Sequence, residues 1–157
     1  MMERKFLMHF IDASFGDSTT NYVQLGEDLE EYNEELNPQV DVKQNILGAQ
    51  RVQHNGYQVQ SNVEPYYAYE DDPLFPKLAA IANERKTGDG CKTTKVDVLV
   101  NEDGTQQWAY REDVVVIPDS IGGDTSGVQI PFTIYNAGNR TAGTWNASNR
   151  TFNPTSA

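Results

Sequence analysis

Two histidines and one cysteine are the residues of this sequence best suited to metal, acid–base or nucleophilic chemistry. His9 stands in an apolar, strand-like segment, and His54 stands in the turn-like run Gln-His-Asn-Gly. The two lie far apart, and a histidine on a strand is more often a packed side chain than a ligand. Cys91, the single cysteine, allows no internal disulfide and no cysteine-based zinc site. We therefore expect no metal and no cofactor, with Cys91 as a small buried or partly buried residue at the start of a strand.

Clusters of acids and glycines are the next candidates for chemistry. Residues 70–72 fit the N-terminal cap of a helix and residues 101–103 fit a hairpin turn, and neither run has the ligand pattern of an EF-hand. Glycines at 122, 123 and 127 do not follow a strand that opens into a helix, as a phosphate-binding loop requires. A glycosidase pair of carboxylates stays open, because sequence spacing does not give their separation in space. We predict that the protein is not an enzyme.

Composition limits the function classes further. The chain has 157 residues, which suits one domain, and its 23 acids against 12 bases give a net charge of −11. Binding of nucleic acid through phosphate neutralisation is therefore disfavoured. No apolar run approaches the roughly 20 residues of a membrane span, and Glu3 and His9 interrupt the apolar N-terminal residues. We expect synthesis in a cytoplasm, without a signal peptide and without a membrane partner.

Alternation of apolar and polar residues with a period of two dominates the chain and predicts a mainly β fold. The segments that show it are residues 40–46, 57–63, 94–100, 106–111, 114–117 and 128–135. The first is predicted to be half-buried, with Val40 and Val42 on its covered face. Asn-Glu-Asp-Gly between the third and fourth predicts a hairpin. Residues 114–117 predict a strand buried on both faces, and Pro131 predicts an edge strand or a bulge in the last segment.

One helix is predicted after Asp71 and Asp72, either of which can cap it, and Pro73 fits its first turn. Its apolar stripe is Leu74, Leu78, Ile81 and Ala82, and Gly88 is predicted to end it. Residues 26–36 form a marginal surface helix or an extended acidic loop, because like charges at helical spacing repel. The tail is rich in Asn, Gly, Ser and Thr. We therefore divide the chain into a domain of residues 1–137 and a flexible C-terminal arm of residues 138–157.

Several short runs follow one another in a specific order. They are Tyr-Val-Gln-Leu-Gly at 22–26, a run beginning Leu-Asn-Pro at 36–47, Gly-Tyr-Gln-Val-Gln at 56–60, Asp-Asp-Pro-Leu-Phe at 71–75 and Gly-Val-Gln-Ile-Pro-Phe at 127–132. This order resembles the major tail tube protein of long-tailed bacteriophages, over about residues 4 to 145. The acidic stretch 27–35 departs from the family.

The resemblance implies a β-sandwich or partial barrel with one flanking α-helix, a long inter-strand loop and a flexible C-terminal arm. It also implies a structural virion protein of the phage tail, in which hexameric rings stack around a negatively charged channel. DNA would pass through this channel without specific binding. Implied partners are the protein itself, a tape-measure protein, the baseplate or tip and a tail terminator. The charge of −11 fits a wall that repels phosphate, and it equally fits a subunit that must stay soluble before assembly.

The same resemblance suggests roles for individual residues. Residues that would line the channel are Asp41, Lys43, Asn45, Gln58 and Gln60. Residues 48–56 would form a loop that contacts a neighbouring subunit or ring through Gly48, Gln50, Arg51, Gln53, His54 and Asn55. The C-terminal arm would lie on a neighbour, anchored by Trp145 and Phe152.

Two other functions remain open. A β-sandwich binding module, of the carbohydrate type, would use Trp108, Tyr110, Tyr66, Tyr67 and Tyr69. A related tube or terminator protein of a phage or of a secretion system would have a similar fold and a different position in the particle.

Overall fold

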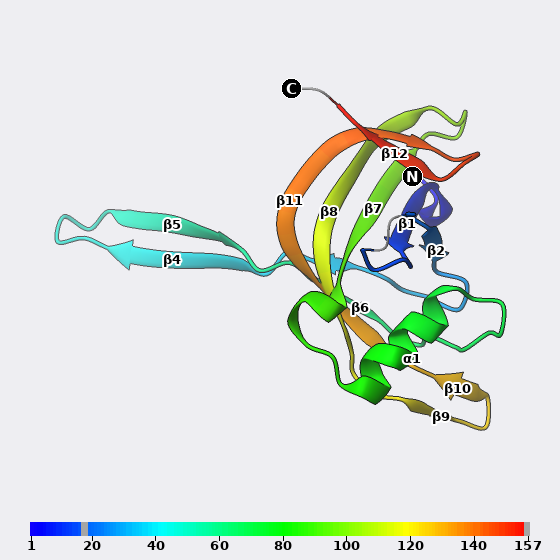
Figure 1. Cartoon of the computed structure of the whole chain (residues 1–157). Helices are drawn as coiled ribbons and strands as arrows, with labels where there is room; N and C mark the ends of the chain where they lie inside the picture. Colours follow the sequence, from blue (N-terminus) through cyan, green and yellow to red (C-terminus); the bar gives the residue numbers. More distant parts are fainter. Residues whose placement is uncertain (17–18, 156–157) are drawn as a thin grey trace.

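Strands dominate the computed structural model, which describes residues 1–16 and 19–155 (Figure 1). Its large sheet curls into a half-barrel with the strand order β2-β1-β7-β8-β11-β6-β3, and β12 pairs with β11. These strands are β1 (Leu7–Asp12), β2 (Tyr22–Leu25), β3 (Glu34–Glu35), β6 (Gln60–Val63), β7 (Lys92–Val100), β8 (Gln106–Pro118), β11 (Phe132–Asn146) and β12 (Thr151–Pro154). The mainly β, partial-barrel prediction is confirmed.

One α-helix and two separate hairpins complete the described elements. They are α1 (Leu74–Glu84), the pair β4 (Pro38–Gln44) and β5 (Gln50–Tyr57), and the pair β9 (Gly122–Asp124) and β10 (Gly127–Gln129), with short 3-10 turns at Arg4–Phe6 and Gly88–Cys91. No helix in the described residues has the length and apolar content that crossing a bilayer requires.

Each face of the large sheet has its own core. The face covered by α1, here called the helix face, carries the main apolar cluster of Ile11, Val63, Leu74, Leu78, Val114, Val116, Phe132 and Ile134. The opposite face, here called the β12 face, carries Phe10, Tyr22, Val96, Val98, Ala109 and Phe152. Residues opposite each other on neighbouring strands share a face, so the register Phe10 to Val96 and Val98 to Ala109 accounts for the second cluster.

The strongest local signals are confirmed. Strands β7 and β8 form the predicted hairpin around the turn at residues 101–104. Helix α1 buries Leu74, Leu78 and Ile81, and Asp72 accepts the N–H of Leu74 at 2.9 Å. The helix ends before the predicted Gly88, because Arg85 adopts a left-handed φ of 52° and its N–H closes on the carbonyl of Ile81. For residues 26–36 the sequence allows either a marginal surface helix or an extended acidic loop. The structure has the loop, together with the short strand β3.

Three strand predictions are wrong in part. Residues 57–63 do not form one strand, because β5 ends at Tyr57 and β6 begins at Gln60. The strand at 114–117 is buried on one face only, since α1 covers Val114 and Val116 while Ile117 is 44% exposed. Residues 128–135 do not form one strand but divide between β10 and β11. Pro131 lies at the break and has no N–H for a sheet ladder, although its carbonyl accepts the N–H of Asp119.

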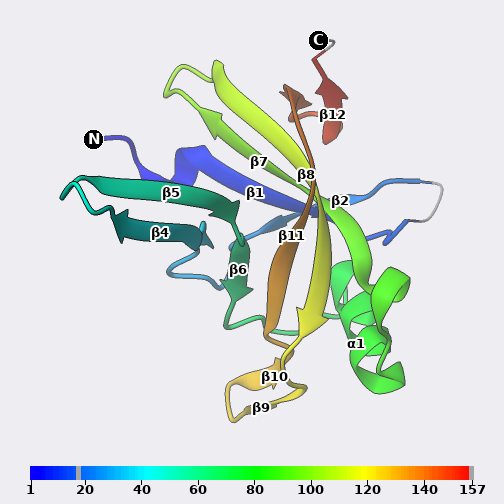
Figure 2. The ribbon, with the colours of Figure 1, turned by 90° about the vertical axis from the view of Figure 1, so that its left-hand side faces the viewer.

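The hairpin of β4 and β5 leaves the body of the protein and extends away from it (Figures 1 and 2). We call residues 38–57 the projecting hairpin. Every residue of β4 is exposed, so the prediction of a half-buried strand at residues 40–46 is wrong for the single chain. The alternation is real, but no segment within residues 1–16 and 19–155 covers its apolar face.

Candidate assembly interface

The projecting hairpin has one apolar face. Val42 and Val52 are directly opposite each other, and Val40 is opposite His54, so these four side chains share that face. Val42 is 60% exposed and Val52 is 69% exposed. A two-stranded hairpin in water is marginally stable by itself, and burial of an apolar face is its usual source of stability. The surface is therefore suited to contact with another chain.

The other face of the projecting hairpin is charged. Lys43 is directly opposite Arg51, and neither forms a hydrogen bond or ion pair within the described residues. Like charges directly opposite each other on a sheet repel and are destabilising. Beside them, Asp41 accepts a hydrogen bond from the side chain of Asn55 at 3.0 Å. An external anion would remove the repulsion between the two bases.

The base of the projecting hairpin is tied to the body through β3. Asn37 donates through its side-chain amide to the carbonyl of Gln58, and the N–H of Gln58 donates to the carbonyl of Asn37. Three residues before Asn37, Glu34 on β3 accepts a hydrogen bond from the Lys95 ammonium at 2.6 Å. The exposed hairpin thus follows directly on a strand that is anchored in the interior of the body.

That anchor belongs to an ionic cluster on the helix face. Its members are His9, Glu34, Lys95, Asp97, Glu112 and Arg140. The sheet register aligns them in two rows, because Asp97 is opposite His9 and Lys95 is opposite Glu112. Lys95 is 2% exposed and Asp97 is 4% exposed. Charges this deeply buried are stable only when they are paired.

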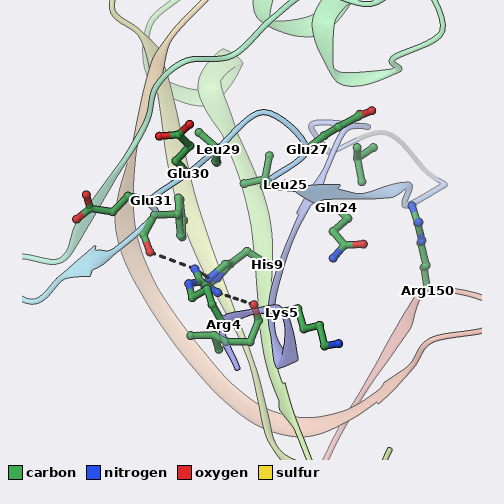
Figure 3. A pocket seen from close by; sticks show the side chains of 14 residues that line it. Arg4, Lys5, His9, Gln24, Leu25, Glu27, Leu29, Glu30, Glu31 and Arg150 are labelled. Atoms are coloured by element: carbon green, nitrogen blue, oxygen red, sulfur yellow. Dashed lines mark hydrogen bonds between the residues drawn. The ribbon is translucent and has the colours of Figure 1, made fainter. Parts of the chain in front are cut away.

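The Arg4 guanidinium fixes the tautomer of His9 (Figure 3). A guanidinium only donates, so Nε2 of His9 accepts from Arg4 at 2.9 Å, and Nδ1 carries the hydrogen that is donated to Asp97 at 2.6 Å. Arg4 also donates to the carbonyls of Leu7 and Tyr32. His9 is therefore a structural link between β1, β7 and the acidic loop.

Burial and pairing act in opposite directions on the two central charges. Burial by itself raises the pKa of Asp97, but the hydrogen bond from His9 and the charge of Lys95 outweigh it and lower the pKa to about 2. Burial by itself lowers the pKa of Lys95, but Asp97, Tyr32 and Glu34 outweigh it and raise the pKa. Both groups are therefore charged over the physiological range.

A cavity of about 570 Å³ lies beside His9, between β1, β2 and the acidic loop (Figure 3). Its charged lining residues are Arg4, Lys5, Arg150, Glu27, Glu30 and Glu31. Signs are mixed, so the cavity has no strong preference for an anion or a cation. Among the described residues, no group of three or more His, Cys, Asp and Glu is placed to hold a metal ion.

The channel-lining candidates do not share one surface. Asp41 and Lys43 lie on the charged face of the projecting hairpin, and Asn45 accepts the N–H groups of Leu47 and Ala49 in its turn. Gln58 lies at the base of this hairpin, whereas Gln60 is on β6 in the body. A channel-lining role for these residues stays a prediction.

The candidates for a neighbour-contacting loop lie instead on a strand. Gly48 is in the turn, whereas Gln50, Arg51, Gln53, His54 and Asn55 belong to β5. The prediction of a loop at 48–56 is wrong because this segment pairs in register with β4. Their contact with a neighbour stays a prediction, and the structure does expose all five.

The predicted C-terminal arm is part of the body as far as residue 155. Strand β11 continues through the boundary at residue 137, and β12 pairs back on it. Trp145 stacks on Phe10 with ring centroids 4.4 Å apart, and Phe152 is 8% exposed in the β12-face core. Residues 156–157 lie outside the described residues. Whether the segment also contacts a neighbour stays a prediction.

The aromatic residues of the carbohydrate alternative form two groups. Trp108 and Tyr110 are adjacent on one face of β8, where the Arg140 guanidinium lies over the Tyr110 ring at 4.3 Å. Tyr66 instead packs on Phe132 and donates to Asp72. Burial and that hydrogen bond raise the pKa of Tyr66. The structure does not bring the five residues together into one platform.

Sequence analysis missed the ionic cluster. The alternation at residues 94–100 separates Lys95 and Asp97 from Val96 and Val98, but it does not indicate that the charged face is buried. The usable signal is that His9, Lys95 and Asp97 each stand next to at least one apolar residue within a strand. Only the pairing of those strands shows that their charges meet. Cys91 is buried as expected, and burial raises the pKa of its thiol.

Compared by sequence, the chain matches no protein-family model and no curated protein. Compared by structure, it resembles the tube-terminating cap of the anti-feeding prophage AFP, with a TM-score of 0.55 and 12% identity over 92% of this chain and 91% of that chain. It also resembles the sheath/tube terminator of the extracellular contractile injection system PVC, in the extended state. The TM-score is 0.53, and the identity is 9% over 92% of this chain and 97% of that chain.

A chain of the PVC sheath–tube complex in the extended state also matches, with a TM-score of 0.53 and 10% identity over 90% of each chain. At these identities the likeness concerns the fold. This chain therefore shares its fold, over nearly its whole length, with components of contractile injection systems.

Proposed function

We propose that the chain is a structural subunit of a phage-like tail tube, in which copies form rings and the rings stack. The observation that carries the proposal is the projecting hairpin, whose apolar face no other described part of the chain covers. The fold shared with tube-associated proteins supports it. We assign the chain no catalytic role.

Burial of the hairpin in an assembly accounts for its composition. Six large hydrophobic side chains are exposed on it, five of them aliphatic (Val40, Val42, Ile46, Leu47 and Val52) and the sixth Tyr57. Fully covering one such side chain stabilises by about 1.5 to 3 kcal/mol. Five of them together can offset a cost of association of about 4 to 15 kcal/mol, and repetition around a ring adds to the effect.

In its finer form, the proposal is a hexameric ring that encloses a negatively charged channel. The net charge of −11 supports a wall that repels phosphate, so that DNA passes without being held. The partners would be further copies of the chain, a tape-measure protein, the baseplate or tip and a tail terminator, within a virion or a related particle.

A tube terminator is the second candidate. Two of the similar structures, the AFP cap and the PVC terminator, are proteins of that kind. A tube subunit must contact copies of itself above and below its ring. A terminator ring instead closes the end of a finished tube and does not stack further.

Electron microscopy of the concentrated, purified chain tests the proposal, with Val42→Asp/Val52→Asp as the matched variant. We expect rings or tubes from the wild type and none from the variant. Single rings that bind the end of a preformed tube would favour the terminator. Monomers under all conditions, even with other tail components present, would contradict both functions.

A further inference from the structure

A second cavity, of about 300 Å³, lies between the loop at residues 26–29 and the segment 65–73. We call it the tyrosine pocket, after Tyr66, Tyr67 and Tyr69 in its lining. Tyr69 connects its two walls by donating to the carboxylate of Asp28 at 2.8 Å. Leu25, Leu29, Pro65 and Pro73 add apolar surface. The pocket is thus an apolar hollow with a polar rim, as protein-binding pockets commonly are.

The charge of the tyrosine pocket has one sign. Its lining, all within the described residues, contains four acids, Glu27, Asp28, Asp71 and Asp72, and no base. Tyrosine hydroxyls donate to Asp28 and Asp72. Glu27 and Asp71 form no hydrogen bond or ion pair within the described residues, and Glu27 extends away from His9 in Figure 3. Two carboxylates of the rim therefore form no ion pair with a cation of the described residues.

The tip of the projecting hairpin has the complementary chemistry. Ile46 is 102% exposed and Leu47 is 88% exposed, because Asn45 closes the turn with both side chains outside it. Lys43 and Arg51 stand three and four residues behind the tip, about 10 to 14 Å along the strands. An apolar tip followed by two bases matches a hollow with an acidic rim.

We propose that the tip of the projecting hairpin binds the tyrosine pocket of a second copy of this chain. Ile46 and Leu47 enter the hollow, and Lys43 and Arg51 pair with Glu27 and Asp71 on its rim. The inference rests on the proposed function and names the partner surface of the hairpin.

Charge distribution favours a second copy over an unrelated partner. The projecting hairpin has two bases and one acid, a net charge of +1, so the rest of the chain carries −12. Lys43 and Arg51 are the only lysine or arginine residues between Lys5 and Lys77. The hairpin extends away from its own body, so the pocket that it meets belongs to another copy (Figure 1).

A charge-exchange experiment tests the contact. One protein carries Lys43→Glu and Arg51→Glu, and a second carries Glu27→Lys and Asp71→Lys. Each alone should need at least about tenfold more protein to associate than the wild type, by sedimentation velocity. Mixing the two should restore association, because each hairpin then meets a pocket of opposite charge. The control Lys86→Glu/Lys92→Glu makes the same change in net charge elsewhere and should associate normally.

The outcomes separate this contact from the proposed function. If the wild type forms rings or tubes and the mixture associates no better than either protein alone, the docking site is wrong and the function stands. If either reversed protein assembles like the wild type, the site is equally wrong. If the wild type stays monomeric under all conditions, the proposed function fails, and this contact fails with it.

Discussion

The body and the projecting hairpin distribute polarity in opposite ways. In the body, Lys95 and Asp97 are buried on the helix face at 2% and 4% exposure, where they pair with each other and with Glu34 and His9. In the hairpin, Val42 and Val52 are 60% and 69% exposed. Alternation thus shows that a strand has two different faces, but it does not show which face is covered.

The difference has a physical cause in each region. In the body, β3 and the acidic loop supply Glu34 and Tyr32 above the strands, so charged side chains find partners without water. In the hairpin, no described segment of the chain lies over the valines. Paired charges buried in the body and apolar residues exposed on the hairpin are therefore compatible with a subunit that completes its burial in an assembly.

Removing a charge from the body should have the largest effect on the single chain. Lys95→Met removes the buried ammonium that pairs with both Asp97 and Glu34, and only His9 then contacts Asp97 and only Arg140, at 3.8 Å, contacts Glu34. We expect a loss of about 3 to 5 kcal/mol in the free energy of unfolding. Urea denaturation of the monomer measures it. Lys92→Met, on the exposed start of the same strand, should change stability by less than about 0.5 kcal/mol. Equal effects of the two would show that the buried pairing is not stabilising.

Phe152→Ala tests whether the C-terminal segment belongs to the body. Phe152 is buried against the β12-face core, so its loss should cost about 3 kcal/mol in the free energy of unfolding. The exposed neighbour gives the control, Asn153→Ala, which should be nearly neutral. A Phe152→Ala monomer as stable as the wild type would instead support a loosely attached arm.

Acid should weaken the body through Asp97. The pKa of this group is lower in the folded chain than in the unfolded one. The ionised carboxylate therefore stabilises the folded chain fully above its unfolded pKa of about 4, and this stabilisation is lost as the pH falls through the folded pKa of about 2. The free energy of unfolding of the wild type should therefore fall with acid between about pH 5 and pH 2. We expect this fall to be about 2 to 3 kcal/mol smaller in Asp97→Asn. The control is Asp71→Asn, at an exposed position. At each pH between 5 and 2, its urea midpoint should be almost the same as that of the wild type.

Changes on the projecting hairpin should have the smallest effect on the monomer. Val42→Ser and Val52→Ser should each alter the free energy of unfolding by less than about 0.5 kcal/mol, because water already surrounds both side chains. The same variants should reduce association strongly in sedimentation velocity. A destabilised monomer would mean that the body covers these residues after all.

Local features were predictable from the sequence, but which face of each strand other parts of the chain bury was not. The turn at residues 101–104 and the stripe Leu74, Leu78 and Ile81 depend on short-range chemistry, and both are confirmed. The ionic cluster joins residues as far apart as His9 and Asp97, so no local pattern contains it. The projecting hairpin was predicted as one strand and a loop, because the segment after its turn is mostly polar.

Amide hydrogen exchange of residues 38–57, in dilute monomer and in assembled protein, tests the central claim most directly. We expect these amides to exchange rapidly in the monomer and at least about tenfold more slowly after assembly, because a neighbouring chain covers the hairpin. Amides of β7 and β8 should exchange at the same rate in both states. Assembled particles in which residues 38–57 exchange as fast as in the monomer would contradict the account.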